Sequence, residues 1–277
     1  MTAVRPIGDH LRDWRQRRRL SQLELALVAG ISARHLSFVE TGRSQPSREL
    51  ILHLAEQLTV PMRDRNVLLV AAGFAPIFPE HALGDPTLEA IRKAVDLVLE
   101  AQKPYPAFAL DRHWQVVASN AALPELYTGV APALLLPPIN AMRLSLHPDG
   151  MASRIANLHE WRAHLIARLR QQIDLSADPV LIDLLKEVDA YPQPSRDPRA
   201  DTIATQHAIA IPFQIITDGG LLSFFSTTTV FGTPIDVTLS ELALELFFPA
   251  DAATIAAVKE IERNRAANQP ALAISSP

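Results

Sequence analysis

Residues 22–42 constrain the fold of this chain more than any other stretch. Ala26 is a small residue inside a predicted helix, and Gly30 follows it four residues later. A small residue lets two helices cross closely, and glycine adopts the positive φ of a tight turn without strain. The apolar residues that would attach both helices to a core are Leu25, Ile31, Leu36 and Val39. This pattern predicts two short helices joined by a tight turn.

Serines mark where several of the predicted helices begin. Ser21 is followed three residues later by Glu24, which completes a capping-box pattern. Ser32 and Ser47 precede two further segments of helical periodicity. The predicted helices cover residues 7–18, 22–29, 33–40, 48–58 and 61–72. We therefore expect an all-α domain of five helices over residues 1–75.

The charge of this first domain differs from that of the remainder. Residues 1–65 contain 11 arginines, no lysine and 7 acidic residues, a net charge of +4, whereas the remaining residues carry 15 basic and 23 acidic side chains, a net of −8. The whole-chain charge of −4 hides this division. A basic domain with a polar helix face is typical of a protein that binds double-stranded DNA. Clustering of the arginines by chance is the alternative.

These features closely resemble the Cro/C1-type helix-turn-helix family, often called the XRE family. The matching residues are Gln22, Ala26, Gly30, Ile31, Leu36 and Val39, followed by Glu40-Thr41-Gly42-Arg43. The resemblance covers about residues 7–72. It implies that the second helix of the pair enters the major groove. We expect a homodimer on a near-palindromic operator, because one module of this size rarely gives enough specificity alone.

The resemblance also implies a role for individual side chains. The expected DNA-binding residues are Gln22, Ser32, Ala33, Arg34, Ser37 and Arg43. Gln22 and Arg43 are expected at phosphates, whereas Ala33, Arg34 and Ser37 are expected to face bases. Arg34 is equally suited to a guanine edge and to a phosphate, and both roles stay open. Arg15 and residues 17–19 have no expected target and form either a solvated basic face or further DNA contacts.

A linker rich in proline and glycine, residues 73–86, separates this domain from the second half of the chain. The second domain is expected over residues 87–265, with mixed helices and strands. Helices are predicted over 87–101, 120–127, 140–146, 151–173, 179–189 and 252–265. Strands are predicted as a hairpin within 107–118, over 205–217 and 221–230 with a turn at 218–220, and over 242–248. The fold class is therefore an all-α domain followed by an α+β domain.

The second domain resembles the MmyB-like ligand-binding domain of bacterial regulators. The residues that carry this resemblance are 106–120, 140–165, 231–234 and 248–251. It implies a PAS-like domain, an antiparallel sheet with helices packed across one face, and an apolar small-molecule ligand such as a fatty acid. The expected ligand-binding residues are Met142, Arg143, Leu146, His147, Leu158, Arg162, Phe213 and Phe225.

The chemistry of these residues permits such a pocket, because apolar side chains can line it and a few polar groups can orient a ligand. Arg143, His147 and Arg162 are the candidates to receive a carboxylate. The alternatives are that the apolar residues pack the core and that Arg143 or Arg162 pairs with Asp149 or Glu160.

Other functions find little support in the sequence. There is no G-x-S-x-G, H-E-x-x-H or P-loop motif, and the chain has no cysteine. His159 and His164 are five residues apart, about 140° around a helix, so we expect no shared metal ion. No catalytic residue and no cofactor are expected. Without a long apolar run or a secretory signal, the chain is expected in the cytoplasm and not in a membrane. The alternatives are a second domain that only dimerises, or an enzyme fused to a DNA-binding module.

Overall fold

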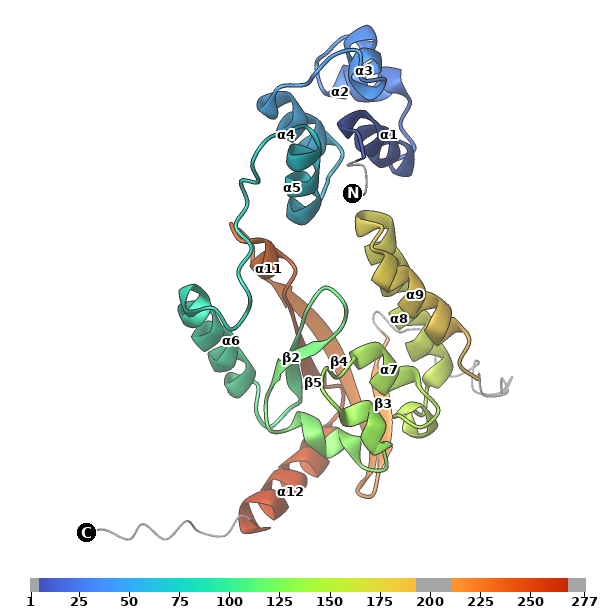
Figure 1. Ribbon diagram of the computed structural model, residues 1–277. Helices are drawn as coiled ribbons and strands as arrows, with labels where there is room; N and C mark the ends of the chain where they lie inside the picture. Colours follow the sequence, from blue (N-terminus) through green and yellow to red (C-terminus); the bar gives the residue numbers. More distant parts are fainter. Residues whose placement is uncertain (1–4, 193–210, 269–277) are drawn as a thin grey trace, which may run out of the picture. The chain divides into compact units, whose positions relative to one another are not determined.

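The computed structural model describes residues 5–192 and 211–268, with side chains up to residue 265 (Figure 1). The chain divides into two compact units that alternate along the sequence. The first unit contains Met1–Ala82 together with Leu169–Ile182 and Thr233–Ser240, and the second contains the remainder. Among the described residues, none of the helices is both long and apolar enough to cross a membrane.

Five helices form the N-terminal region, as predicted. They are α1 (Ile7–Arg17), α2 (Gln22–Val28), α3 (Ala33–Glu40), α4 (Arg48–Gln57) and α5 (Met62–Ala71). The capping box at α2 is present, because Ser21 Oγ accepts from the Glu24 N–H at 3.1 Å and Glu24 Oε2 accepts from the Ser21 N–H at 2.7 Å. The side chains of Ser32 and Ser47 cap α3 and α4 in the same way.

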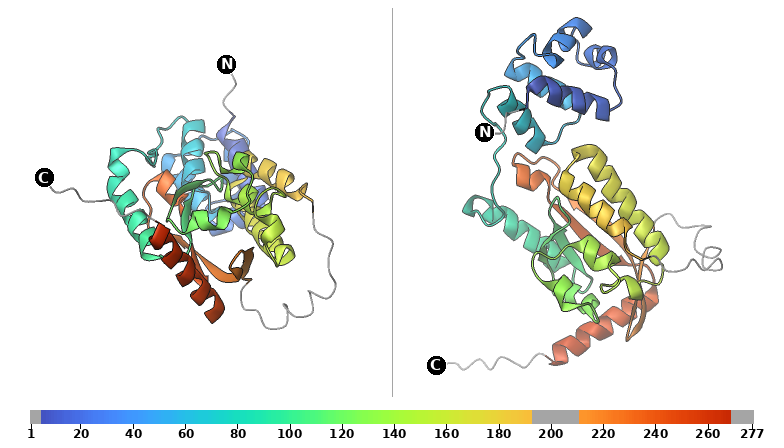
Figure 2. Two further views of the ribbon diagram at one scale, coloured as in Figure 1. Left: turned by 90° about the horizontal axis from the view of Figure 1, so that it is seen from below. Right: turned by 45° about the vertical axis from the view of Figure 1, so that its right-hand side comes forward.

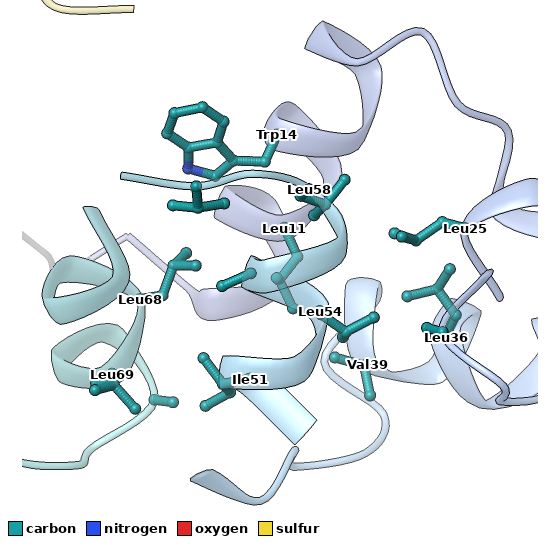
Figure 3. Packing of buried hydrophobic residues seen from close by; sticks show 14 of the residues in the cluster. Leu11, Trp14, Leu25, Leu36, Val39, Ile51, Leu54, Leu58, Leu68 and Leu69 are labelled. Atoms are coloured by element: carbon teal, nitrogen blue, oxygen red, sulfur yellow. The ribbon is translucent and has the colours of Figure 1, made fainter. Parts of the chain in front are cut away.

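Leucines from all five helices fill the core of this region. Figure 3 shows Leu11, Leu25, Leu36, Leu54 and Leu68, each with no exposed surface, packed against one another. Trp14 closes one side of the core and is 6% exposed. Burying one such side chain stabilises the fold by about 1.5–3 kcal/mol, so the core holds the five helices together.

Two glycines determine how the first three helices meet. Gly30 has a φ of +63°, and the N–H groups of Gly30 and Ile31 donate to the carbonyl groups of Leu27 and Ala26, the two bonds of a Schellman motif. Gly8 acts differently, since a Cβ atom there would lie 2.5 Å from the carbonyl oxygen of Glu40. The predicted turn at Gly30 is confirmed, and at Gly8 the backbone of α1 approaches the end of α3 closely.

The second half contains a five-stranded antiparallel sheet. Its strands are β1 (Ala107–Leu110), β2 (Val116–Ser119), β3 (Phe213–Thr217), β4 (Gly220–Val230) and β5 (Ala243–Pro249), in the order β2-β1-β5-β4-β3. The tight turn between Thr217 and Gly220 lies where the sequence predicts it. Residues 205–210 of the predicted strand lie outside the described residues.

Helices precede, separate and follow these strands along the chain. They are α6 (Glu89–Ala101), α7 (Ala141–Leu146), α8 (Leu158–Ser176), α9 (Pro179–Asp189), α11 (Val237–Ser240) and α12 (Ala252–Asn268). Short 3-10 helices are η1 (Pro86–Leu88), η2 (Leu123–Tyr127), η3 (Pro132–Leu135) and η4 (Ala152–Arg154). Helix α7 and the first part of α8 cover the sheet face that bears Phe108 and Phe247 (Figure 2). Helix α6 contacts β1 and β2, and α12 contacts β4 and β5.

The predicted helix over residues 151–173 starts later than expected. Ile155 instead forms an isolated β-bridge with Ile215. Asn157 holds the chain beside β3, because its Nδ2 donates to the carbonyl group of Pro212 at 2.8 Å and its Oδ1 accepts from the N–H of Gln214 at 3.2 Å. Helix α8 therefore begins only at Leu158.

Candidate DNA-reading face and ligand cavity

Helix α3 presents a polar surface to solvent. Ser32 and Arg34 are exposed and Ser37 is half-buried, all on the side of α3 that faces away from the core. Ala33 is also half-buried and packs against the core. Three of the residues predicted to face or approach DNA are therefore accessible on α3.

Phe38 supports two of the exposed arginines. The guanidinium carbon of Arg34 lies 5.2 Å from the centre of the Phe38 ring, and that of Arg43 lies 5.9 Å from the same centre. Cation–π contacts of this kind at exposed sites contribute about 0.5–1 kcal/mol. Phe38 thus limits the orientations of one cation in the first turn of α3 and one just after its last residue, which reduces the entropy that they lose when they bind an anion.

Glu40 forms a buried ion pair beneath this surface. Its side chain has no exposed surface and accepts from Arg15 at 2.6 and 2.9 Å. Gln22 Nε2 donates to the same carboxylate at 2.8 Å, and Arg12 donates to the Glu40 carbonyl group at 2.9 Å. Burial raises the pKa of Glu40, but the hydrogen bonds from Arg15 and Gln22 and the charges of Arg15 and Arg12 outweigh it, so the pKa lies below its usual value.

In this network the side chains of Gln22 and Arg15 both donate to the buried carboxylate of Glu40. The Gln22 amide holds Glu40, while its backbone lies at the start of α2, where N–H groups favour an anion. Arg15 is 9% exposed and is part of the core boundary, not a solvated basic face. Arg18 donates to the carbonyl groups of Leu58 and Thr59. Phosphate contact by Gln22 stays a prediction.

A small cavity of about 50 Å³ lies between the sheet and the helices α7 and α8. Its lining is mostly apolar and aromatic. The aromatic lining residues include Phe108, Trp114, Tyr127, Trp161, Phe213 and Phe247. Phe213 lies 5.0 Å from Trp161 and 5.7 Å from Phe247 between ring centres, so these rings form one packed cluster.

The charged groups of the cavity are Arg168 from α8 and Glu245 from β5. They form an ion pair, and Glu245 is only 3% exposed. Thr228 Oγ1 donates to Glu245 at 2.8 Å, and Arg168 lies 5.0 Å from the centre of the Trp114 ring. A charge in an apolar setting is costly unless it is paired, so this cluster satisfies Glu245. Because the Arg168 side chain is 25% exposed, this pair marks the solvent side of the cavity.

The other polar groups of the cavity are neutral. Trp161 Nε1 donates to Ser145 Oγ at 3.0 Å, which joins α8 to α7. Burial raises the pKa of the Tyr127 hydroxyl to about 12, so this group stays protonated at ordinary pH. His164 lies beside Trp161 but outside the lining, and burial, followed by the charge of Arg168, lowers its pKa, although Glu245 opposes this effect. The interior is therefore apolar with a charged pair at one side.

Of the predicted ligand residues, Phe213 lines the cavity. Met142 and Leu146 are buried, and Leu158 is half-buried at the start of α8, but these three are not among the lining residues. Arg143 lies elsewhere, because its guanidinium donates to Glu187 at 2.8 and 2.7 Å at the surface.

The remaining predicted ligand residues also lie away from the lining. His147 packs against Tyr191, with ring centres 5.0 Å apart. Arg162 is 6% exposed, and its Nη2 lies 3.6 Å from the carboxylate of Asp189. Phe225 is 40% exposed and lies on the sheet face opposite Phe224, because adjacent strand residues point to opposite faces. Ligand contact by these residues stays a prediction.

Sequence reasoning missed Arg168 and Glu245, although one signal pointed to them. Glu245 is the only charged residue in the predicted strand 242–248, and a charge in a buried strand requires a partner. Phe38 follows Arg34 by four residues, a spacing at which side chains on a helix meet. Arg15 and Glu40 gave no such local signal. No group of three side chains able to hold a metal ion occurs among the described residues.

The two sites define a class of protein: a helix-turn-helix module combined with a domain that encloses a small apolar cavity. The MmyB-like transcription regulator ligand binding domain matches residues 91–261, and a helix-turn-helix domain matches residues 11–64. Since the first match covers more than half of the chain, the chain belongs to the family defined by this MmyB-like domain. Both resemblances stated from the sequence are confirmed.

Two comparisons with known proteins give partial matches. An uncharacterized HTH-type transcriptional regulator, RghRB of Bacillus subtilis (strain 168), is 40% identical over 77 residues, which are 27% of this chain and 53% of that protein. The match therefore spans about half the length of this relative. The structure of an RNA-binding light-oxygen-voltage receptor is 14% identical, with a TM-score of 0.26, over 96% of this chain and 65% of that chain.

Proposed function

We propose that this protein is a sequence-specific transcriptional regulator that reads double-stranded operator DNA with α3. The exposed face of α3, where Phe38 supports both Arg34 and Arg43, carries this proposal. The net charge of +4 over residues 1–65 supplies attraction to phosphates. The regulator acts as a homodimer in the cytoplasm, with half-site centres about 34 Å apart or a multiple of this distance.

Salt titration of DNA binding by the full chain tests this proposal. The logarithm of the affinity should fall linearly with the logarithm of salt concentration, with a slope of about −0.9 for each neutralised phosphate. Arg43→Ala should make the slope shallower by about one such contact. Arg63→Ala is the matched control, because Arg63 pairs with Glu80 and lies outside α3. An affinity that does not change with salt would contradict the proposal.

We further propose that the second domain binds a hydrophobic acid, most plausibly a fatty acid, and is not an enzyme. The apolar lining suits an acyl chain, and Arg168 supplies a cation for the carboxylate. Arg168 would bind the incoming acid in addition to Glu245, because a guanidinium has five N–H donors. Drug-sized ligands occupy pockets of about 300–1,000 Å³. A volume of about 50 Å³ means that side chains fill most of this space, so α7 or α8 must move to admit the ligand.

The same small volume favours the alternative, in which the second domain only dimerises. Native mass spectrometry of the purified full chain distinguishes a ligand-binding second domain from one that only dimerises. A co-purified acyl acid would support ligand binding. Affinity should also rise by up to about 0.8 kcal/mol for each added CH₂ until the cavity is full. Arg168→Gln should weaken an acid more than its alcohol analogue, and Arg143→Ala should weaken neither. Equal losses for acid and alcohol in Arg168→Gln would contradict the proposed role of Arg168.

A further inference from the structure

Trp114 has a backbone conformation that residues of its type rarely adopt. It lies in the turn between β1 and β2, and its φ is +64°. This left-handed region is uncommon for residues other than glycine, and a bulky side chain there is strained. Strained residues persist only where the surrounding structure holds them, and they cluster at functional sites. The side chain of Trp114 therefore requires an explanation beyond the turn itself.

Hydrogen bonds on both sides keep the turn in this conformation. Asp111 Oδ1 accepts from the N–H groups of His113 and Gln115 at 2.8 and 2.9 Å. The Asp111 carbonyl group accepts from the Trp114 N–H at 3.1 Å. The Trp114 carbonyl group accepts from the Ala141 N–H at 2.8 Å, which joins the turn to the start of α7. The backbone at Trp114 is therefore fixed, and its indole has a defined position.

The indole of Trp114 lies in the lining of the apolar cavity, beside the cation of that lining. It is 7% exposed, and the guanidinium carbon of Arg168 lies over its ring, 5.0 Å from the centre. Among the described residues, Arg168 uses Nη2 for its hydrogen bonds to both Thr228 and Glu245. Its Nη1 and Nε therefore keep N–H donors for a further anion. An aromatic ring covers the face of a guanidinium and leaves the N–H groups at its edge accessible.

We infer that Trp114 is a positioning residue for the proposed ligand, because its ring orients the guanidinium of Arg168 toward the carboxylate of a fatty acid. Thr228 and Glu245 bond to a single nitrogen, so they leave the plane of the guanidinium free to turn, whereas the ring fixes this plane. A cation that is already oriented loses less freedom when it binds an anion. Trp114 therefore favours a charged ligand over a neutral one. The inference rests on the proposed function, in which Arg168 binds the acid.

The preference for an acid over its alcohol measures this role. The probes are decanoic acid and decan-1-ol, titrated calorimetrically into the full chain at pH 8, where the acid is ionised. Trp114→Leu keeps an apolar lining but removes the ring. The ratio of acid affinity to alcohol affinity should therefore fall by about 3- to 30-fold. Trp114→Phe should keep part of the ratio, because a phenyl ring binds a cation more weakly than an indole.

Trp161→Leu is the matched control for the loss of an indole from the cavity. Trp161 also lines the cavity, but its ring packs against Phe213 at 5.0 Å between ring centres. Its replacement should weaken the acid and the alcohol alike and leave their ratio unchanged. Far-UV circular dichroism shows which variants are folded. If Trp114→Leu does not fold, Trp114→Phe carries the test through a smaller fall in the same ratio.

A double-mutant cycle shows whether Trp114 acts through Arg168. In an Arg168→Gln chain the guanidinium is absent, so adding Trp114→Leu should not change the ratio further. A second fall of the ratio in this chain would overturn the inference. So would an equal loss of acid and alcohol in Trp114→Leu alone, which would make Trp114 a packing residue while fatty-acid binding stands. An unmodified chain that binds neither probe would overturn the proposed ligand and the inference together.

Discussion

At the scale of single residues, Glu40 joins the buried ion pair of the N-terminal region to α3, the helix proposed to read DNA. Its carboxylate holds Arg15 and Gln22, and its carbonyl group accepts from Arg12. It is also the last residue of α3, the helix with the exposed arginine. The position of α3 relative to α1 and α2 therefore depends on one buried charge.

Replacing Glu40 should destabilise the protein strongly. In Glu40→Gln the buried guanidinium of Arg15 keeps its charge and loses its counter-ion, and removing one partner of a buried pair costs about 3–5 kcal/mol. Urea denaturation at pH 7 measures this loss. Glu56→Gln is the matched control, because Glu56 is exposed on α4 and should change the free energy of unfolding little. A loss equal to that of the control would show that the pair does not stabilise the fold.

The same ion pair predicts a dependence of stability on pH. The folded chain holds the pKa of Glu40 below its ordinary value of 4.5. The unfolded chain therefore binds this proton more readily, so the contribution of Glu40 is complete above pH 4.5 and is lost as the pH falls through the lower folded pKa. Denaturation midpoints measured from pH 6 down to pH 3 should fall more steeply for the unmodified chain than for Glu40→Gln. Midpoints that fall in parallel for the two proteins would show that Glu40 does not cause this pH dependence.

Arg34 has two possible roles that one measurement separates. If it reads a guanine, Arg34→Ala should reduce discrimination at one base pair by about 1–3 kcal/mol and leave other positions unchanged. If it binds a phosphate, affinity should fall equally for all sequences. Binding to a set of operators with single substitutions distinguishes these results. Arg43→Ala provides the comparison, since Arg43 shares the Phe38 contact and is predicted to bind a phosphate.

At the scale of elements, two glycines support the helix-turn-helix for different reasons. Gly30 has open space around it but a φ of +63°, so Gly30→Ala should cost about 1–2 kcal/mol through backbone strain. Gly8 lacks space, because an added Cβ atom would lie 2.5 Å from the carbonyl oxygen of Glu40 and 2.7 Å from that of Val39. Both contacts are with backbone, so Gly8→Ala must displace α1 from α3.

Thermal denaturation should therefore rank these variants. We expect Gly8→Ala to lower the melting temperature more than Gly30→Ala, since overpacking against backbone costs about 1–3 kcal/mol or more. Gly84→Ala is the control, because Gly84 has neither a positive φ nor a close neighbour. The reverse order would show that α1 moves away from α3 at little cost.

The elements that sequence reasoning identified are those whose signals are local. Ser21 and Glu24 are three residues apart, and both the capping box and α2 follow from them. The start of α8 escaped prediction because Asn157 bonds to residues 55 and 57 positions away. The pair of Arg15 and Glu40 spans 25 positions, and that of Arg168 and Glu245 spans 77. A single sequence shows which residues are charged, but the fold determines which charges meet.

At the scale of the whole molecule, a ligand for the cavity should stabilise the chain by mass action. A fatty acid at 100 times its dissociation constant would add about 2.7 kcal/mol to the free energy of unfolding. The melting temperature of the full chain should rise with ligand concentration, and Arg168→Gln should reduce this rise. Arg143→Ala should keep it, because Arg143 pairs with Glu187 away from the cavity. A melting temperature that stays unchanged at all fatty-acid concentrations would favour the alternative in which the second domain only dimerises.

The alternation of the two units along the sequence also determines the order in which the protein is completed during its synthesis. The apolar core of the five helices lies within residues 7–74, so it can form early on the ribosome. Leu169–Ile182 and Thr233–Ser240 belong to the same unit but emerge later. At about 5–20 residues per second, Ser240 is added on the order of ten seconds or more after Ala82. A nascent chain therefore carries a folded α3 while its own unit is still incomplete, and the unit is complete only after Ser240 has been added.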